Sequence, residues 1–136
     1  STDMVTLTVS GASGTDTVHF VFNQAGNGPG VTLQGTSGKD IIFATDGDDT
    51  LTGDAGHDQF VFTPLSSGSV QHTVTDFETL SDKIDIRQFA AVASLADISA
   101  VQQGNDTLIT LDSHDTILLQ NVVATNLNAG NFIFHA

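Results

Sequence analysis

The chain has 136 residues, of which 39% are hydrophobic, so it is long enough for one domain with a modest core. Three basic residues face 16 acidic ones, and the formal net charge of −13 repels nucleic acid phosphates and anionic lipid surfaces, so we expect neither as a partner. No stretch approaches the roughly 18 apolar residues of a membrane-spanning helix, so we expect no membrane insertion.

The first 34 residues are expected to form strands and one degenerate repeat. Residues 5–9 and 17–22 alternate apolar and polar side chains, as half-buried strands do. Between them, residues 11–18 place glycines and an aspartate as a nine-residue repeat would, and we interpret this segment as a hairpin turn first and a calcium half-site second. The sequence leaves open whether residues 1–30 cap the following segment or belong to a preceding domain.

The most informative segment is residues 35–62, where three nine-residue units follow one another without interruption. Each unit has glycine at its fourth position, aspartate at its sixth and a large apolar residue at its eighth. These residues are Gly38, Asp40 and Ile42; Gly47, Asp49 and Leu51; and Gly56, Asp58 and Phe60. Three matches in register are a strong signal, whereas a single glycine and aspartate turn is a weak one, because both are ordinary turn residues.

Each position of the unit has a physical role. Glycine reaches backbone angles that other residues adopt only at a cost, so the turn can direct its carbonyls inward. Aspartate supplies an anionic oxygen, which suits a hard cation that takes six to eight oxygen ligands at about 2.3–2.6 Å. The apolar eighth residue points into a core between two sheets. This pattern is typical of a calcium-binding parallel β-roll, and since one coil takes two units, Asp40 is expected to stack on Asp58.

The repeat resembles the RTX family of secreted bacterial proteins. In that family, the earlier turn of a stacked pair gives carbonyls from its second and fourth positions, and the later turn gives them from its first and third. The resemblance therefore implies one Ca²⁺ ion held by six residues, which are Thr36, Gly38, Asp40, Gly53, Ala55 and Asp58.

The middle turn is a second candidate calcium site, through Thr45, Gly47 and Asp49. Ala44 replaces its first glycine. Its expected neighbours, residues 26–33 and 62–67, lack aspartate at the sixth position. A calcium ion here would need water or neighbouring carbonyls to complete its shell.

Residues 76–85 suggest further ligands. Asp76 lies two units after Asp58, and the pattern Asp-Phe followed by Asp-Lys-Ile-Asp resembles the segment that closes the roll in secreted serralysin-type proteases. In those relatives, aspartates of this segment bind calcium next to the last glycine-rich turn. The resemblance implies Asp76 and Asp82 as additional ligands.

The rest of the chain is expected to be β-structure. Residues 89–95 could form one short helical turn, residues 107–111 and 116–119 flank a four-residue hairpin connection, and a last strand covers residues 131–134. We therefore predict one all-β domain, a short calcium-binding parallel β-roll flanked by antiparallel strands. Its parts are residues 1–34, the repeats at 35–62, and a closing segment with a sandwich-like β cap at 63–136.

Residues 104–122 and 132–134 resemble the C-terminal ends of RTX adhesins and other type I secretion substrates, in which the C-terminus is read by an ABC-transporter complex. Residues 1–10 lack the features of a signal peptide, so we expect the chain to be the C-terminal part of a larger protein. The resemblance implies a secreted, extracellular or cell-surface module that calcium folds after export. The chain has no cysteine, so bound calcium would take the place of disulfides.

We expect no catalytic activity. There is no His-x-x-x-His spacing and no Gly-x-Ser-x-Gly motif, and each of the five histidines is expected to have a surface or strand-face role. An alternative function is a calcium-dependent adhesive or carbohydrate-binding module with a surface polysaccharide as partner. The absence of tryptophan and tyrosine lowers the expectation of sugar binding, although bound calcium could coordinate sugar hydroxyls.

Overall fold

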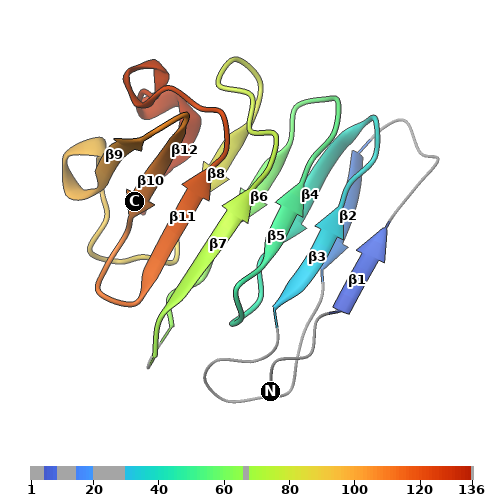
Figure 1. Cartoon of the computed structure of the whole chain (residues 1–136), viewed down its shortest axis with the longest axis horizontal. Coiled ribbons are helices and arrows are strands. Elements are labelled where there is room, and N and C mark those ends of the chain that lie inside the picture. The colour runs from blue at the N-terminus through green and yellow to red at the C-terminus, as the bar shows by residue number, and fades with distance from the viewer. Residues whose placement is uncertain (1–4, 9–14, 20–29, 66–67, 136) are drawn as a thin grey trace.

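A computed structural model describes residues 5–8, 15–19, 30–65 and 68–135. Two β-sheets lie face to face and are joined by turns along two edges (Figure 1). In spatial order, the seven-stranded sheet contains β1 (Val5–Thr8), β3 (Val31–Gln34), β5 (Thr50–Thr52), β7 (Val70–Val74), β11 (Asp115–Leu119), β10 (Asp106–Thr110) and β9 (Ser99–Gln103). The five-stranded sheet contains β12 (Phe132–Ile133), β8 (Lys83–Asp85), β6 (Gln59–Val61), β4 (Lys39–Phe43) and β2 (Thr15–His19).

Helical structure is minor in the described part of the chain. It consists of three 3-10 helices, which are η1 (Leu95–Asp97), η2 (Ala124–Asn126) and η3 (Ala129–Asn131). The predicted helical turn at residues 89–95 thus begins later, at the end of that range. No helix among the described residues is long and apolar enough to cross a membrane.

The nonapeptide units form a parallel roll, as predicted. Successive strands alternate between the two sheets, so that β3 pairs with β5 and β4 pairs with β6. Leu33 lies opposite Leu51, and Ile42 lies opposite Phe60, which is a shift of two units in each case. One coil therefore takes two nonapeptides, and the turns stack in two columns.

The roll begins earlier than predicted. β1 pairs in parallel with β3, and β2 pairs in parallel with β4, so β1 and β2 lie in different sheets. The hairpin interpretation of residues 11–18 is therefore wrong, because a hairpin would join neighbouring antiparallel strands of one sheet. Asp16 lies in register with Asp40. Residues 11–14 and 20–29 lie outside the described residues.

The coil after β6 is longer than two units. Leu51 pairs with Val74, and Phe60 pairs with Ile84, because more residues separate β6 from β7 than separate the earlier strands of the roll. Residues 62–67 were predicted to stack under the middle turn. That prediction is wrong, since the start of β7 occupies this position.

Antiparallel strands close the roll, as predicted. β10 and β11 form a hairpin across residues 111–114, and β9 adds to the far side of β10. β11 also pairs in parallel with β7, so the cap continues the seven-stranded sheet.

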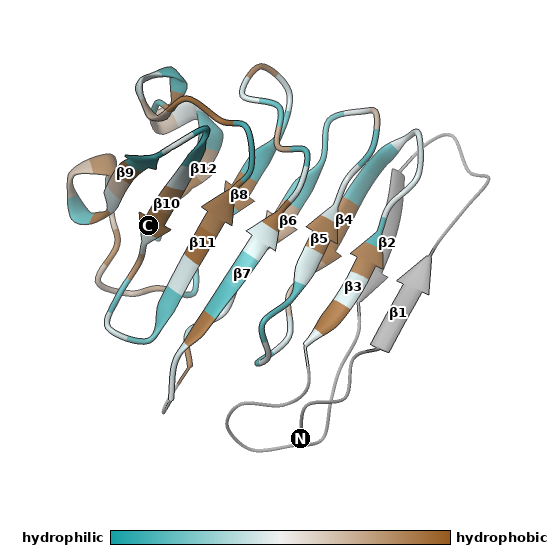
Figure 2. Cartoon of the chain, viewed as in Figure 1, coloured by the Kyte–Doolittle hydropathy of each residue, from teal (hydrophilic) through white to brown (hydrophobic). Residues whose placement is uncertain are grey.

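The core lies between the two sheets. The eighth-position residues Ile42, Leu51 and Phe60 are fully buried, which confirms their predicted role. Other strands add apolar side chains to the same cluster, among them Leu33, Val74, Ile84, Ile109, Ile117 and Leu119. Figure 2 shows hydrophilic residues gathered in the turns at the ends of the strands. The sheets therefore hold the polar turns in fixed stacks at the two edges of the roll.

Candidate metal site

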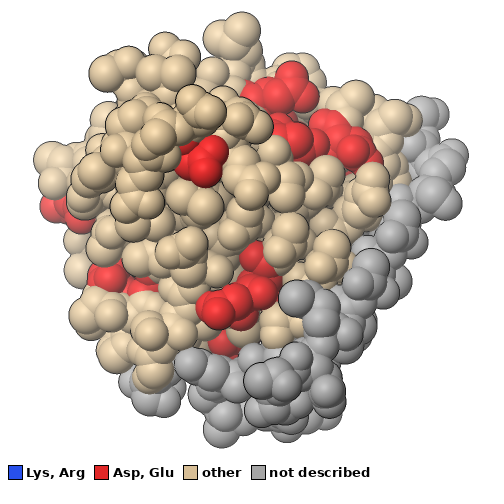
Figure 3. Space-filling model, in the orientation of Figure 1, with Lys and Arg blue, Asp and Glu red and all other residues tan. Residues whose placement is uncertain are grey.

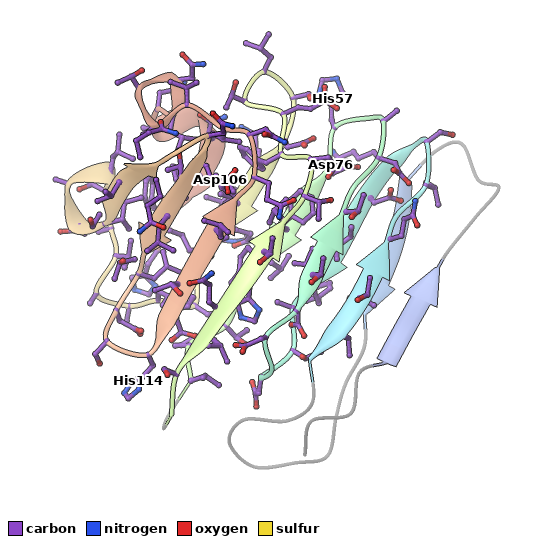
Figure 4. The ribbon with its side chains drawn as sticks, in the orientation of Figure 1. His57, Asp76, Asp106 and His114 are labelled. Carbon is purple, nitrogen blue, oxygen red and sulfur yellow. The ribbon has the colours of Figure 1, made fainter. Side chains whose placement is uncertain are left out.

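Two columns of turns carry the acidic residues. The first edge contains the turns at residues 35–38, 53–58 and 75–82, and the second edge contains residues 44–49, 62–69 and 111–114. Figure 4 shows His57 and Asp76 at the first edge and His114 at the second. Successive strands of the roll belong to alternate sheets, so successive turns lie at alternate edges. Residues that are two units apart in the sequence therefore lie next to each other at the same edge.

The first turn is built around the carboxylate of Asp40, which is fully buried. Its Oδ2 accepts a hydrogen bond from the Thr36 backbone N at 2.6 Å, and its Oδ1 accepts one from the Thr36 hydroxyl at 2.9 Å. A Cβ atom at Gly35 would lie 2.3 Å from Asp40 Oδ2. Glycine at the first position is thus required because the carboxylate packs directly against it.

The second turn of this edge leaves a carboxylate oxygen without a partner. Asp58 Oδ1 accepts a hydrogen bond from the Asp40 backbone N at 3.0 Å, which confirms that the two aspartates stack. Asp58 is only 1% exposed, yet its Oδ2 has no hydrogen-bond partner among the described residues. The Asp54 backbone N, which occupies the position of Thr36, donates instead to Asp76 Oδ2 at 2.7 Å.

A third aspartate completes this stack. Asp82 Oδ1 accepts a hydrogen bond from the Asp58 backbone N at 2.9 Å, and Asp82 Oδ2 accepts one from the Glu78 backbone N at 2.8 Å. We call Asp40, Asp58 and Asp82 the aspartate column. All three side chains belong to residues that are 2% exposed or less. The closing turn therefore repeats the geometry of the first turn.

Asp76 lies at the same edge but not in the column. Its Oδ1 accepts from the Gly53 backbone N at 2.9 Å, and its Oδ2 accepts from Asp54. The inference that Asp76 stacks under Asp58 is wrong, because the longer connection after β6 shifts the register and brings Asp82 to that position. Asp54 has a positive φ of 64°, so the bonds to Asp76 hold this turn in an unusual conformation.

The column is electrostatically unfavourable without a cation. Burial, with the nearby charges of Asp82, Asp40 and Asp76, raises the pKa of Asp58 from its ordinary 3.8 to about 7. Burial, with the charges of Glu78 and Asp76, raises the pKa of Asp82 to about 6. Hydrogen bonds from the backbone oppose both shifts but do not cancel them. A divalent cation would stabilise these carboxylates in their ionised form.

The residues at the first edge fit calcium. A Cβ at Gly56 would lie 2.3 Å from the Gly38 carbonyl oxygen, and a Cβ at Gly35 would lie 2.9 Å from the Gly53 carbonyl oxygen. These two predicted carbonyl ligands therefore lie in the narrow space between the first and second turns of the edge. No group of three or more acidic or histidine side chains in the described part converges closely enough to hold a metal alone. Backbone carbonyls would have to supply the remaining oxygen ligands, as in an oxygen-only calcium site.

The second edge is built differently. Asp49 Oδ2 accepts from the Thr45 backbone N at 2.5 Å, which repeats the pairing of Asp40 with Thr36. The Gly47 backbone N donates to the Thr45 hydroxyl at 3.3 Å, so the three residues predicted for the middle turn do lie together. The next coil supplies His72, whose Nδ1 lies 3.3 Å from Asp49 Oδ2.

Two residues of the second edge were missed by the sequence interpretation. His72 is 2% exposed and packs against the ring of Phe62, so of the predicted surface and strand-face roles it has the second, on the inner face of β7. Asp115 is equally buried, and its Oδ1 has no partner among the described residues. Burial, with a contribution from Asp112, raises the pKa of Asp115 to about 6. The only sequence signal for either residue is the alternation of β7 and β11, which directs both side chains inward.

Comparisons with known proteins agree with this architecture. A protein-family model for the RTX calcium-binding nonapeptide repeat matches four copies, over residues 32–61 and 96–119. The first range covers the roll, whereas the second covers β9 to β11, where the strands are antiparallel. No curated protein matches the chain at a significant level.

Two solved structures share the fold. The AlgE6R3 subunit from the Azotobacter vinelandii mannuronan C5-epimerase is 22% identical, with a TM-score of 0.62 over 98% of this chain and 80% of that one. The AlgE6R2 subunit from the same kind of enzyme is 21% identical, with a TM-score of 0.65 over 98% of this chain and 93% of that one. At this level of identity, the similarity establishes the β-roll fold.

Proposed function

We propose that this chain, in which residues 32–61 and 96–119 match the RTX calcium-binding nonapeptide repeat, is a module whose folding is coupled to calcium at its first edge. Asp40 and Asp58 would supply carboxylate oxygens, and Thr36, Gly38, Gly53 and Ala55 would supply backbone carbonyls. The observation that carries the proposal is the buried Oδ2 of Asp58, which has no hydrogen-bond partner among the described residues. An uncompensated buried carboxylate is costly, and a cation beside it removes that cost.

Two further sites form part of the proposal. Asp82, with Asp76 beside it, would serve an ion between the turn at residues 53–58 and the closing turn. Thr45, Gly47 and Asp49 would form a weaker site on the second edge, where the next coil brings a histidine in place of an aspartate. Calcium prefers oxygen ligands, so this neighbour makes the second edge the less favourable location.

We infer that the module works outside the cell, as the non-catalytic part of a larger protein exported by a type I secretion system. Support comes from the resemblance of residues 104–122 and 132–134 to the C-terminal ends of such proteins. Extracellular calcium modules operate with dissociation constants of about 10⁻⁴–10⁻³ M, so the chain would stay largely unfolded where calcium is scarce. Folding after export would then favour movement of the chain outward.

Circular dichroism during calcium titration of the chelator-treated protein tests the coupling. We expect a cooperative rise in β-structure with calcium and little response to magnesium, which demands an octahedral shell and gives up water reluctantly. The double variant D40A/D58A should need a much higher calcium concentration for the same change. A chain that is already fully folded after chelation, or a variant with an unaltered titration, would refute the coupling.

A second candidate function is that of a calcium-dependent carbohydrate-binding module. A groove lined by polar and charged residues adjoins the first edge, and two of the chain's three basic residues belong to it. The two similar solved structures are subunits from a mannuronan C5-epimerase, which makes a polysaccharide a reasonable partner to test.

A further inference from the structure

The basic residues of this acidic chain are confined to one region. Lys39 begins β4, Lys83 begins β8, and Arg87 follows β8 by two residues, so all three belong to the five-stranded sheet or its margin. Figure 3 shows the outer face of the opposite, seven-stranded sheet, on which acidic and uncharged residues are visible and no lysine or arginine is. The positive charge of the molecule is therefore local.

Two of these residues line a groove on the outside of the roll. The groove has a volume of about 270 Å³ and is lined by Lys39, His57, Asp58, Gln59, Ser81 and Lys83. Strand register explains its shape, because Gln59 lies beside Lys83, and Lys39 stands level with His57 one strand away. β4, β6 and β8 are neighbours, so the Cα atoms of the two lysines are two strand spacings apart and offset by two residues along the strands, a separation of about 12 Å.

The two lysines have charge to offer a ligand. Lys39 is exposed and makes no ion pair with any described side chain. Lys83 is exposed and donates one hydrogen bond to the Gly130 carbonyl oxygen, which leaves two of its three protons. Arg87 is excluded from this role, because its guanidinium pairs with Asp85 at 2.7 Å.

We propose that this groove binds a carboxylate-bearing oligosaccharide, such as a short uronate chain. The two ammonium groups would pair with carboxylates of the ligand. Gln59 Nε2 already donates to Asp85 and His57 Nδ1 lies 3.2 Å from the Ser81 carbonyl oxygen, so hydrogen bonds to ligand hydroxyl groups would come from the Gln59 side-chain oxygen, His57 Nε2 and the Ser81 hydroxyl. A neutral sugar is less suitable, since the chain has neither tryptophan nor tyrosine for stacking. The proposal rests on the second candidate function above and names its ligand class and its residues.

The position of the groove also favours a saccharide over an acidic peptide as its ligand. Extended peptides commonly bind by adding a strand to a free sheet edge, where main-chain hydrogen bonds are available. β4, β6 and β8 are each paired on both sides, so their main chains offer no such edge. Recognition here must come from side chains that point away from the sheet, and these are charged and polar.

Calcium should control access to this groove. Asp58 lines it and is also a proposed calcium ligand, so its negative charge opposes an anionic ligand until a cation compensates it. We therefore expect uronate binding to require calcium.

The test uses isothermal titration of the calcium-loaded chain with uronate oligomers too short to gel with calcium. The expected result is binding to the uronate oligomer, no binding to a neutral oligosaccharide of the same length, and at least a tenfold loss of affinity in K39Q/K83Q. Backbone amide shifts of Lys39, Gln59 and Lys83 in NMR spectra should report the same site.

A matched control lowers the net charge equally but away from the groove. Q103E/N105D adds two negative charges at β9 and the turn after it, where both residues are exposed. We expect this variant to keep its uronate affinity within about twofold. Equal loss in both double variants, equal binding of poly-aspartate, or no uronate binding by a chain that folds normally with calcium would each overturn the proposal. Calcium-induced folding, followed separately by circular dichroism, distinguishes these outcomes from failure of the calcium module itself.

Discussion

Asp58 concentrates the electrostatic cost of the calcium-free state. Burial and the neighbouring aspartates raise its pKa to about 7 in the folded chain, against 3.8 for an ordinary aspartate. Between about pH 4 and pH 7, the carboxyl group of Asp58 is therefore protonated to a greater extent in the folded state than in the unfolded state. The free energy of unfolding of the calcium-free protein should fall as the pH rises through this window, and the raised pKa of Asp82 acts in the same direction.

The folded fraction of the calcium-free chain at pH 5 and pH 7.5, measured by circular dichroism, checks the direction of this dependence. We expect a larger folded fraction at pH 5, and a higher urea midpoint at pH 7.5 once calcium is saturating, because calcium requires the ionised carboxylate. The variant D58N provides the control, since a neutral amide can keep the hydrogen bond from the Asp40 backbone N. It should be less sensitive to pH without calcium. A calcium-free protein that gains stability between pH 5 and pH 7.5 would contradict the burial argument.

At the level of elements, sequence spacing predicted the regular coils and failed at the irregular one. The nine-residue period fixed the partners of β3, β4, β5 and β6, and with them the stacking of Asp40 on Asp58. It could not predict the register of β5 and β6 with the next coil, β7 and β8, because the length of the connection at residues 62–69 follows no period. Asp82 therefore took the position expected for Asp76.

The parallel pairing of β1 with β3 and of β2 with β4 was missed for a related reason. Alternation predicts a strand but does not reveal whether the next strand joins the same sheet or the opposite one. The buried position of His72 was missed because a histidine carries no pattern of its own. The sequence therefore predicted strand pairing and side-chain position correctly where a characteristic residue type recurred at a regular spacing.

The closing turn between β7 and β8 separates two roles for aspartate. Asp76 accepts hydrogen bonds from the Gly53 and Asp54 backbone N atoms, so D76A should lower the free energy of unfolding of the calcium-loaded chain by about 1.5–3 kcal/mol. Asp82 also accepts two backbone hydrogen bonds, so D82A should lower it by a similar amount, but Asp82 lies in the aspartate column, so D82A should in addition weaken calcium binding at least tenfold more than D76A does. Urea unfolding and calorimetric calcium titration of both variants measure the two effects. The assignment fails if the two variants bind calcium equally well.

The whole molecule has a net charge of −13 and no cysteine, so no disulfide can stabilise it against the repulsion of its acidic residues. Cations can reduce this repulsion. Monovalent salt and calcium act on this charge in different ways. Salt screens exposed charges over a Debye length of about 10 Å at 0.1 M, but it screens buried groups much less. The aspartate column is almost fully buried, so screening should leave its repulsion largely intact.

Thermal unfolding distinguishes the two mechanisms. At a calcium concentration 100 times the dissociation constant, each site adds about 2.7 kcal/mol to the free energy of unfolding, which for a chain of this size raises Tm by roughly 10 °C. Sodium chloride at matched ionic strength should raise Tm by much less, because it reaches only the exposed carboxylates. If sodium chloride reproduced most of the calcium effect, the stabilisation would come from general screening of the acidic surface. A large rise in Tm with calcium alone would show that the stabilisation comes from the aspartate column, where a bound calcium ion compensates the buried charges that ionic strength does not screen.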